Sequence, residues 1–108
     1  MAGSVVYRSE GVKVRHSHLD PGKEIPWHRH SSITDLVFAV RGEVTVQTLD
    51  PPTRLTLKAG DSYHVPPGQP HKISNPTDAR IEFLLIQGVG AYDFSTLDDG
   101  ADLSSVNL

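Results

Sequence analysis

The sequence contains no cysteine, and only one methionine and one tryptophan occur among its 108 residues. The absence of cysteine excludes disulfide bonds, thiol catalysis and any zinc site built on thiolates. No apolar run approaches the ~20 residues that a membrane-spanning helix needs, and the N-terminal Met-Ala-Gly-Ser lacks the apolar core of a signal peptide. We therefore expect a cytoplasmic protein without a membrane partner.

A strong charge of either sign is also missing. The chain has 10 Lys and Arg, 13 Asp and Glu, and a formal net charge of −3. Four of the acidic residues lie in 91–108, which contains no Lys or Arg. The rest of the chain is nearly neutral and lacks the basic surface that sequence-independent binding of nucleic acid requires. We expect one domain over residues 1–90 and an acidic tail over 91–108 that packs on this domain or on a partner subunit.

Long helices are not expected, because 8 prolines and 9 glycines are spread along the chain. Between them lie short runs in which polar and apolar residues alternate, at 12–16, 43–47, 54–58 and 80–83. Alternation of this kind, with turns every eight to twelve residues, is typical of antiparallel β-sheets. Residues 36–40 are apolar on both faces, which suits a strand between two layers or one covered by a partner subunit. The sequence predicts an all-β domain, either a sandwich or a small barrel.

Histidines form the most informative pattern in the sequence. His28 and His30 are separated by one residue, so on an extended chain their side chains point to the same face, with β-carbons about 6–7 Å apart. His71 follows the loop Pro-Pro-Gly-Gln-Pro and can approach from a neighbouring strand. On an unbroken strand, Asp35 would point to the face opposite His28 and His30, because it lies five residues after His30. A turn through 31–34 would have to bring its side chain to their face. Three neutral imidazoles and one carboxylate suit Fe(II), Mn(II), Ni(II), Co(II) or Zn(II), but not calcium or magnesium.

The spacing around these histidines resembles the two sequence motifs of the cupin superfamily, over residues 22–75. The motif positions are Gly22, His28, His30, Asp35 and Gly42, followed by Gly60, Pro66, Gly68, His71 and Asn75. The resemblance implies a double-stranded β-helix, or jelly-roll barrel, with a divalent metal inside and a substrate pocket at one mouth. It implies that His28, His30, Asp35 and His71 hold the metal. It also implies a homodimer, because cupin barrels usually pair sheet against sheet.

Asp35 is the one departure from this pattern, because the family usually has glutamate there. Aspartate is one methylene shorter, which removes about 1.5 Å of reach. In one alternative, the backbone moves inward so that Asp35 binds the metal directly. In the other, Asp35 acts through a water molecule, as a base beside a metal that is held by three histidines.

Other residues are candidates for supporting roles. By alternation, either His64 or its neighbour Tyr63 must face the interior, so His64 is a candidate catalytic proton shuttle, with a surface histidine as the alternative. Trp27 adjoins His28 and is a candidate for the pocket mouth, for packing or for a dimer contact. His16 and His18 repeat the spacing of one intervening residue but have no supporting carboxylate, so we interpret them as surface or interface residues.

The metal site suggests the class of reaction. A metal with open positions acts as a Lewis acid, activates water or, as Fe(II), binds O₂. Neutral ligands leave the ion more positive, which favours an anionic, chelating small molecule such as an enolate, carboxylate or β-diketone. We predict a metal-dependent enzyme in which Asp35 and His64 assist catalysis. Dioxygenase-type C–C cleavage is the leading reaction, ahead of decarboxylation, isomerisation and lyase chemistry. The alternatives are a non-catalytic metal-containing barrel that binds or senses a small ligand, and a structural barrel with a vestigial site.

Overall fold

The computed structural model describes residues 2–88 and 95–96, and these residues form strands and no helix. Within this part of the chain, no helix is long and apolar enough to cross a membrane. The strands are β1 (Ala2–Ser9), β2 (Val12–Leu19), β3 (Glu24–Arg29), β4 (Thr34–Arg41), β5 (Val44–Thr48), β6 (Thr53–Leu57), β7 (Ser62–Val65), β8 (His71–Ser74), β9 (Ile81–Gly88) and β10 (Ser95–Thr96).

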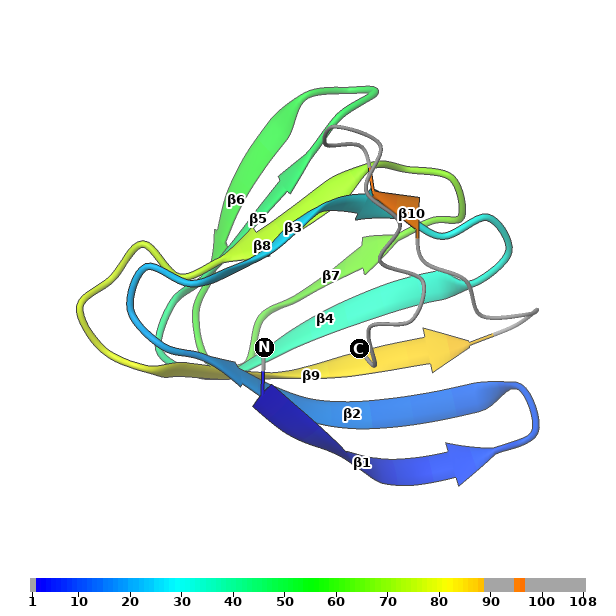
Figure 1. The fold of residues 1–108 in the computed structure, drawn as a ribbon, viewed down its shortest axis with the longest axis horizontal. Coiled ribbons are helices and arrows are strands. Elements are labelled where there is room, and N and C mark those ends of the chain that lie inside the picture. Colours follow the sequence, from blue (N-terminus) through cyan, green and yellow to red (C-terminus); the bar gives the residue numbers. More distant parts are fainter. Residues whose placement is uncertain (1, 89–94, 97–108) are drawn as a thin grey trace.

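The strands form two five-stranded antiparallel sheets that face each other (Figure 1). Sheet A has the order β1-β2-β9-β4-β7, and sheet B has the order β10-β3-β8-β5-β6. From β3 to β9 the chain crosses repeatedly between the sheets, so neighbours in a sheet are mostly distant in sequence. The structure therefore confirms the predicted all-β jelly-roll barrel.

The apolar core lies between the two sheets. In sheet B, Ile25, Ile73 and Val46 occupy one row across β3, β8 and β5. In sheet A, Val37 of β4 lies opposite Leu85 of β9. The buried apolar residues of this cluster are Leu19, Ile25, Val37, Ala39, Val44, Val46, Leu57, Ile73, Ile81, Phe83 and Leu85. Since alternate residues of each strand point inward, the sequence's period of two produces this core directly.

Glycines of the two motifs lie at turns whose backbone conformation is unfavourable for residues with a side chain. Positive φ angles occur at Gly22, Gly42, Gly60 and Gly68, as their turn positions predict. At Gly42, φ is +75°, and a β-carbon would lie 2.9 Å from Cγ2 of Ile81. Both the backbone conformation and the close approach of β9 therefore require glycine there.

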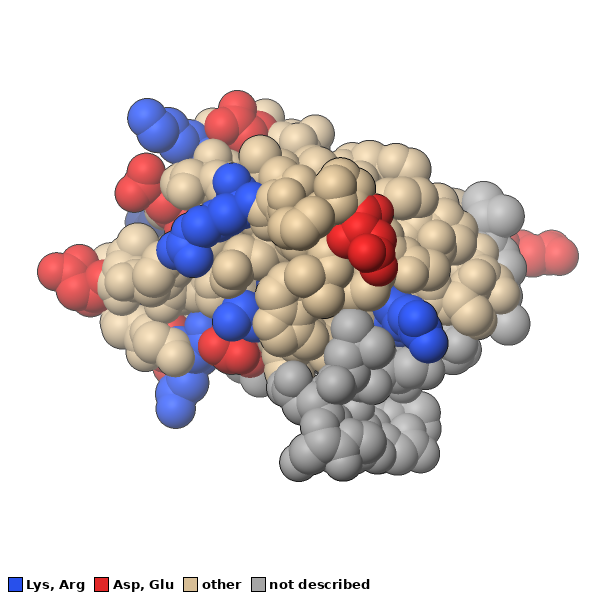
Figure 2. All heavy atoms as spheres, turned by 90° about the horizontal axis from the view of Figure 1, so that it is seen from above, with Lys and Arg blue, Asp and Glu red and all other residues tan. Residues whose placement is uncertain are grey.

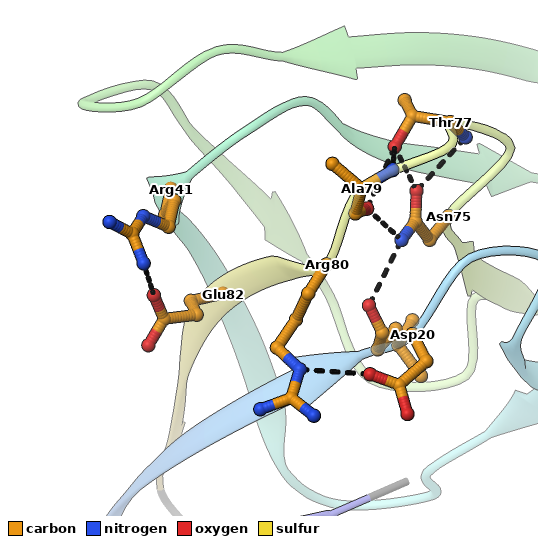
Figure 3. Close-up of polar contacts among 8 residues, drawn as sticks. Asp20, Arg41, Asn75, Thr77, Ala79, Arg80 and Glu82 are labelled. Carbon is orange, nitrogen blue, oxygen red and sulfur yellow. Dashed lines mark hydrogen bonds and ion pairs between the residues drawn. The ribbon is translucent and has the colours of Figure 1, made fainter.

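The turn between β8 and β9 is held by one side chain (Figure 3). Asn75 Nδ2 donates hydrogen bonds to the carbonyls of Leu19 (2.9 Å) and Ala79 (2.7 Å). Its Oδ1 accepts from the backbone N–H and the hydroxyl of Thr77, at 3.0 and 2.6 Å. Asn75, one of the motif positions, thus bonds the local backbone, and its bond to Leu19 ties this turn to the end of β2.

Acidic and basic side chains are interspersed among uncharged residues on the face shown in Figure 2. The acidic tail predicted over 91–108 lies outside the described residues apart from β10. There, Ser95 and Thr96 pair with Arg29 and His28, which adds a short edge strand to sheet B beside β3.

Candidate metal centre

Four side chains converge at one end of the barrel interior. The potential ligand atoms of His28, His30, Asp35 and His71 all lie within 4.8 Å of one another, and all four residues are buried. Asp35 Oδ2 lies 2.9 Å from Nε2 of His30 and 3.2 Å from Nε2 of His71. The imidazole rings of His28 and His71 are 4.1 Å apart between centroids. The structure thus brings together the four residues of the predicted site.

The convergence follows from the strand topology. His28 of β3 and His71 of β8 lie directly opposite each other in sheet B. A register shift between Ile25 and His28 places both residues inward although two residues separate them. The chain then leaves sheet B after His30 and enters sheet A with β4, so Asp35 faces the histidines from the opposite sheet. Parity along one strand therefore does not apply, because His30 directly follows β3 of sheet B whereas Asp35 belongs to β4 of sheet A.

A loop links the two sequence motifs at the site. The backbone N–H of Gly68 donates to the carbonyl of His30 at 2.7 Å, and Gln69 closes the turn onto Pro66 at 3.3 Å. Gly68 has a φ of +83°, so glycine permits this turn. The loop that delivers His71 is therefore anchored to the backbone of another potential ligand.

Two backbone carbonyls orient the histidine rings. Nδ1 of His28 lies 2.7 Å from the carbonyl of Pro26, and Nδ1 of His71 lies 3.0 Å from the carbonyl of Gln69. A carbonyl only accepts hydrogen bonds, so each Nδ1 carries the proton and donates it. This leaves Nε2 of His71 facing Oδ2 of Asp35 at 3.2 Å. Histidines that bind a metal through one ring nitrogen commonly have the other fixed by a carbonyl in this way.

The electrostatics also suit a metal. Burial lowers the pKa of His28 to about 3, and the neighbouring His71 acts in the same direction. Burial alone would raise the pKa of Asp35, but hydrogen bonds with His30 and His71 outweigh it and hold that pKa well below its usual range. A neutral imidazole and an ionised carboxylate are the protonation states that bind a divalent ion.

The distances are those expected for ligands of one ion. Two atoms bound at about 2.1 Å to the same octahedral metal ion lie about 3 Å apart when adjacent and about 4.2 Å apart when opposite. The separations of 2.9 and 3.2 Å fit adjacent ligands, and the overall limit of 4.8 Å requires only a small adjustment. In addition, Asp35 Oδ1 is buried and has no hydrogen-bond partner among the described residues. The four residues therefore fit a divalent transition metal, without selecting one among those predicted.

His64 is not part of this cluster. Its side chain is exposed, while Tyr63 is half-buried and Val65 is buried on the same strand, β7. Opposite His64 in register is Leu36, which points away from the interior because its neighbour Asp35 points inward. Of the two alternatives from alternation, Tyr63 is the residue that faces the core.

The other candidates also lie outside the cluster. His16 is partly exposed on the outer face of sheet A, where its Nε2 is 3.2 Å from Glu82 Oε1. Trp27 lines an open cleft of about 350 Å³ together with Gln47, Thr48, Leu49, Pro52, Thr53 and Arg54. None of the four cluster residues lines this cleft, so the structure places Trp27 beside a separate surface depression.

Polar residues near the cluster were not anticipated from the sequence. Gln87 of β9 lies opposite Asp35 on one side and opposite Lys13 of β2 on the other. Arg15, two residues along β2, is only 6% exposed. The pattern of β2 contains one indication that Lys13 and Arg15 point inward, because they share the parity of Leu19, which is a buried core residue.

Fold and site together define a jelly-roll barrel with a buried cluster of three histidines and one aspartate. The sequence matches the family model described as "Cupin domain" over residues 15–87, so this chain belongs to the cupin family. No curated protein matches it in sequence.

Solved structures agree with this assignment. An uncharacterized conserved protein with a double-stranded β-helix domain from Klebsiella pneumoniae is 30% identical, with a TM-score of 0.74. That match covers 87% of this chain and 81% of the other. The protein TT1209 from Thermus thermophilus is 26% identical, with a TM-score of 0.74 and coverage of 82% and 83%.

A more distant neighbour shares the fold alone. Recombinant oxalate oxidase, solved with glycolate, is 20% identical with a TM-score of 0.74. The match covers 82% of this chain but only 47% of that protein's chain. Peruvianin-I, a cysteine peptidase from Thevetia peruviana latex, is likewise 20% identical, and 56% of its length is covered. This chain thus spans about half the length of both proteins.

Proposed function

We propose that this cupin is a metal-dependent enzyme that acts on a small, anionic, chelating organic molecule. Dioxygenase-type C–C cleavage is the leading reaction, ahead of decarboxylation, isomerisation and lyase chemistry. The observation that carries this proposal is the convergence of His28, His30, Asp35 and His71, with ligand atoms within 4.8 Å of one another inside the barrel. A cytoplasmic location, expected from the lack of cysteine, belongs to the same proposal.

Each residue of the cluster has a defined role in this proposal. His28, His30 and His71 hold the metal through Nε2, and the carbonyls of Pro26 and Gln69 keep two of these rings in place. A bound divalent ion supplies Lewis acidity and, as Fe(II), the electrons for chemistry with O₂. Six-coordinate ions would keep two positions for substrate or water beyond the four protein ligands. Burial of the cluster excludes bulk water from the reacting groups.

Asp35 is proposed as a direct ligand. The distances of 2.9 and 3.2 Å from Oδ2 to the two Nε2 atoms support this role, despite the side chain being shorter than glutamate. Its other oxygen, Oδ1, makes no hydrogen bond among the described residues and is available to accept a proton or orient a water molecule. Asp35→Asn should weaken metal binding at least tenfold if Asp35 is a ligand. An unchanged metal affinity would instead place it one water molecule away.

Activity is tested after metal removal and reloading. The protein loaded separately with Fe(II), Mn(II), Ni(II), Co(II) or Zn(II) is mixed with acetylacetone or a catechol, and O₂ uptake and products are followed. Consumption of O₂ together with product that contains both of its atoms supports the dioxygenase proposal. Tight binding of such molecules without turnover by any metal form would favour the second candidate, a metal-containing binding or sensing barrel.

A homodimer is part of the same proposal. On the outer face of sheet A, Val14, Ile86 and Leu36 form a row across β2, β9 and β4, next to the pair Leu84 and Phe38. These residues alternate with the inward-facing core and are partly exposed. A second copy of this small domain would bury this apolar surface. Sedimentation should give a dimer for the wild type and a monomer for Phe38→Asp, and a monomeric wild type would contradict the proposal.

A further inference from the structure

A buried amide lies next to the candidate metal centre. Gln87 is the last inward-facing residue of β9, and its side chain is only 4% exposed. Among the described residues, its Oε1 has no hydrogen-bond partner. A buried side-chain carbonyl without a donor is rare in folded proteins, because its hydrogen bonds to water are lost on folding without replacement. Gln87 is therefore a candidate to meet a molecule that binds inside the barrel.

Strand register places this amide beside Asp35. The two residues are direct partners in the antiparallel pair of β9 and β4, and the register is regular at this point. Directly opposite residues on one face of a sheet have β-carbons about 4.5–5.5 Å apart. Both side chains are buried on the inward face, and that of glutamine is one methylene longer than that of aspartate. The amide of Gln87 therefore lies within reach of a molecule bound beside the carboxylate of Asp35.

Asp35 supplies a second acceptor without a donor. Its Oδ2 lies 2.9 Å from Nε2 of His30 and 3.2 Å from Nε2 of His71. Its Oδ1, in contrast, is buried and accepts no hydrogen bond from the described residues. Since Oδ1 has no partner, the amide of Gln87 does not donate to it, and Gln87 does not simply support the carboxylate. Two neighbouring residues thus each present an acceptor oxygen that lacks a donor.

In the described part of the chain, the adjoining inward positions supply no donor to these two oxygens. On the other side of Asp35, its partner in β7 is the apolar Val65. On the other side of Gln87 lies Lys13 of β2, but neither oxygen accepts a hydrogen bond from it. The next inward pair of β4 and β9 is apolar. The missing donor therefore has to come from a bound molecule.

We propose that Gln87 is a specificity-determining residue that accepts a hydrogen bond from the substrate at the metal centre. The substrate then binds the ion through an atom that carries hydrogen, in a hydroxyl or an amine, and donates to Oε1 of Gln87 or Oδ1 of Asp35. A chelator whose metal-binding oxygens carry no hydrogen would leave both acceptors without a donor and is disfavoured. This inference rests on the proposed function and narrows its substrate class to chelating anions that contain such a hydroxyl or amine.

Binding to the Co(II)-loaded protein, measured by calorimetry and by the visible spectrum of the metal, tests this role. Lactate and 2-methoxypropionate differ in whether the second metal-binding oxygen carries a hydrogen or a methyl group. Alanine and N,N-dimethylalanine make the same comparison for a metal-binding nitrogen. Relative to free Co(II) in water, the wild type should prefer the hydrogen-bearing member of at least one pair by about tenfold. The pair that shows the preference identifies the donor as a hydroxyl or an amine.

Gln87→Met separates a hydrogen bond from a steric preference. Methionine keeps the length of the side chain but is a much weaker acceptor, so the preference for the hydrogen-bearing compound should be lost. The affinity for Co(II), and for acetylacetone as a chelator without a donor, should not change. Gln47→Met, the same substitution at a half-buried position of β5 in the cleft beside Trp27, should match the wild type. If Gln87→Met does not fold, as judged by thermal melting, Gln87→Leu replaces it with the same expected loss.

Several results would overturn the role of Gln87 while the metal site stands. A wild type without a preference in either pair recognises no donor, and this result requires no variant. A preference that persists in Gln87→Met is steric. A loss of Co(II) affinity in Gln87→Met that equals its loss of lactate affinity would show that Gln87 only supports Asp35.

Failure of the proposed function is recognised separately. If the wild type binds no Co(II), the metal-dependent function fails, and the same four compounds are then titrated into the metal-free protein. A preference for the hydrogen-bearing compounds that Gln87→Met abolishes would still support the role of Gln87. The absence of such a preference would overturn it.

Discussion

The two ends of the barrel interior are built by the same strands but differ in chemistry. Along β4, the inward positions change from Asp35 to Val37 and Ala39, and along β9 they change from Gln87 to apolar residues. In sheet B, the row containing His28 and His71 similarly gives way to the row of Ile25 and Ile73. One pattern of alternation therefore produces an apolar end and a polar end in a single domain.

The apolar end and the polar end have different consequences for stability and for binding. Burial of the apolar end stabilises the fold by about 25 cal/mol for each Å² removed from water. The polar end holds imidazoles and a carboxylate that are costly to bury without a partner. We therefore expect substitutions at the apolar end to change stability, and substitutions at the polar end to change metal binding.

The largest effect is expected from Phe83→Ala at the apolar end. Phe83 is fully buried, so its truncation should lower the free energy of unfolding by about 3–5 kcal/mol, as measured by urea denaturation. The metal bound per folded chain should not change. A loss below about 1 kcal/mol would show that this end does not carry the stability of the fold.

Metal removal is expected to act through the polar end alone. At a free metal concentration about 1,000 times the dissociation constant, binding stabilises the folded state by about 4 kcal/mol. Addition of Zn(II) to the chelator-treated wild type should therefore raise its melting temperature, whereas His71→Ala should show little change. An equal rise in both proteins would place the stabilising ion elsewhere.

The pH dependence of the metal-free protein should reflect His28. Its pKa is about 3 in the folded protein and 6.5 in the unfolded chain, so the unfolded state takes up the proton first as the pH falls. Above pH 6.5, protonation of His28 does not affect the free energy of unfolding. As the pH is lowered toward 3, protonation of the unfolded chain lowers this free energy, by about 3 kcal/mol between about pH 7 and pH 4. His28→Gln should lose less stability than the wild type over this range. Parallel curves for the two proteins would contradict this account.

A smaller effect is expected for Asn75→Ala. This substitution removes the bonds to Leu19 and Ala79 at the turn after β8, and should lower the free energy of unfolding by about 2 kcal/mol. Asp78→Ala, an exposed change in the same turn, serves as the control. The metal affinity of both variants should equal that of the wild type, and a selective loss in Asn75→Ala would show that the two ends are coupled.

Much of the fold and the cluster could be predicted from the sequence. The shared face of His28 and His30 follows from strand parity, and the turn glycines and Asn75 follow from local conformation. The position of Asp35 required knowledge of the crossing between sheets, which parity along one strand does not contain. The resemblance of the motif spacing to cupins supplied that information.

Alternation alone could not decide which face of a strand points inward. For β7 it left open whether His64 or Tyr63 faces the core, and the structure has Tyr63 inward. For β2 the alternation gave opposing signals, because Val12 and Val14 favour one orientation, whereas Leu19, which shares the parity of Lys13 and Arg15, favours the other. The outward valines are explained by the apolar outer face of sheet A, which only the strand order reveals.

The most direct test of the central claim is the metal content of protein purified without added metal or chelator, measured by mass spectrometry. We predict about one divalent transition-metal ion per chain for the wild type and for His16→Ala, whose side chain lies on the outer face beside Glu82. His30→Ala should retain less than about a tenth of this amount. Equal metal content in His30→Ala and His16→Ala would contradict the assignment of the cluster as the metal centre.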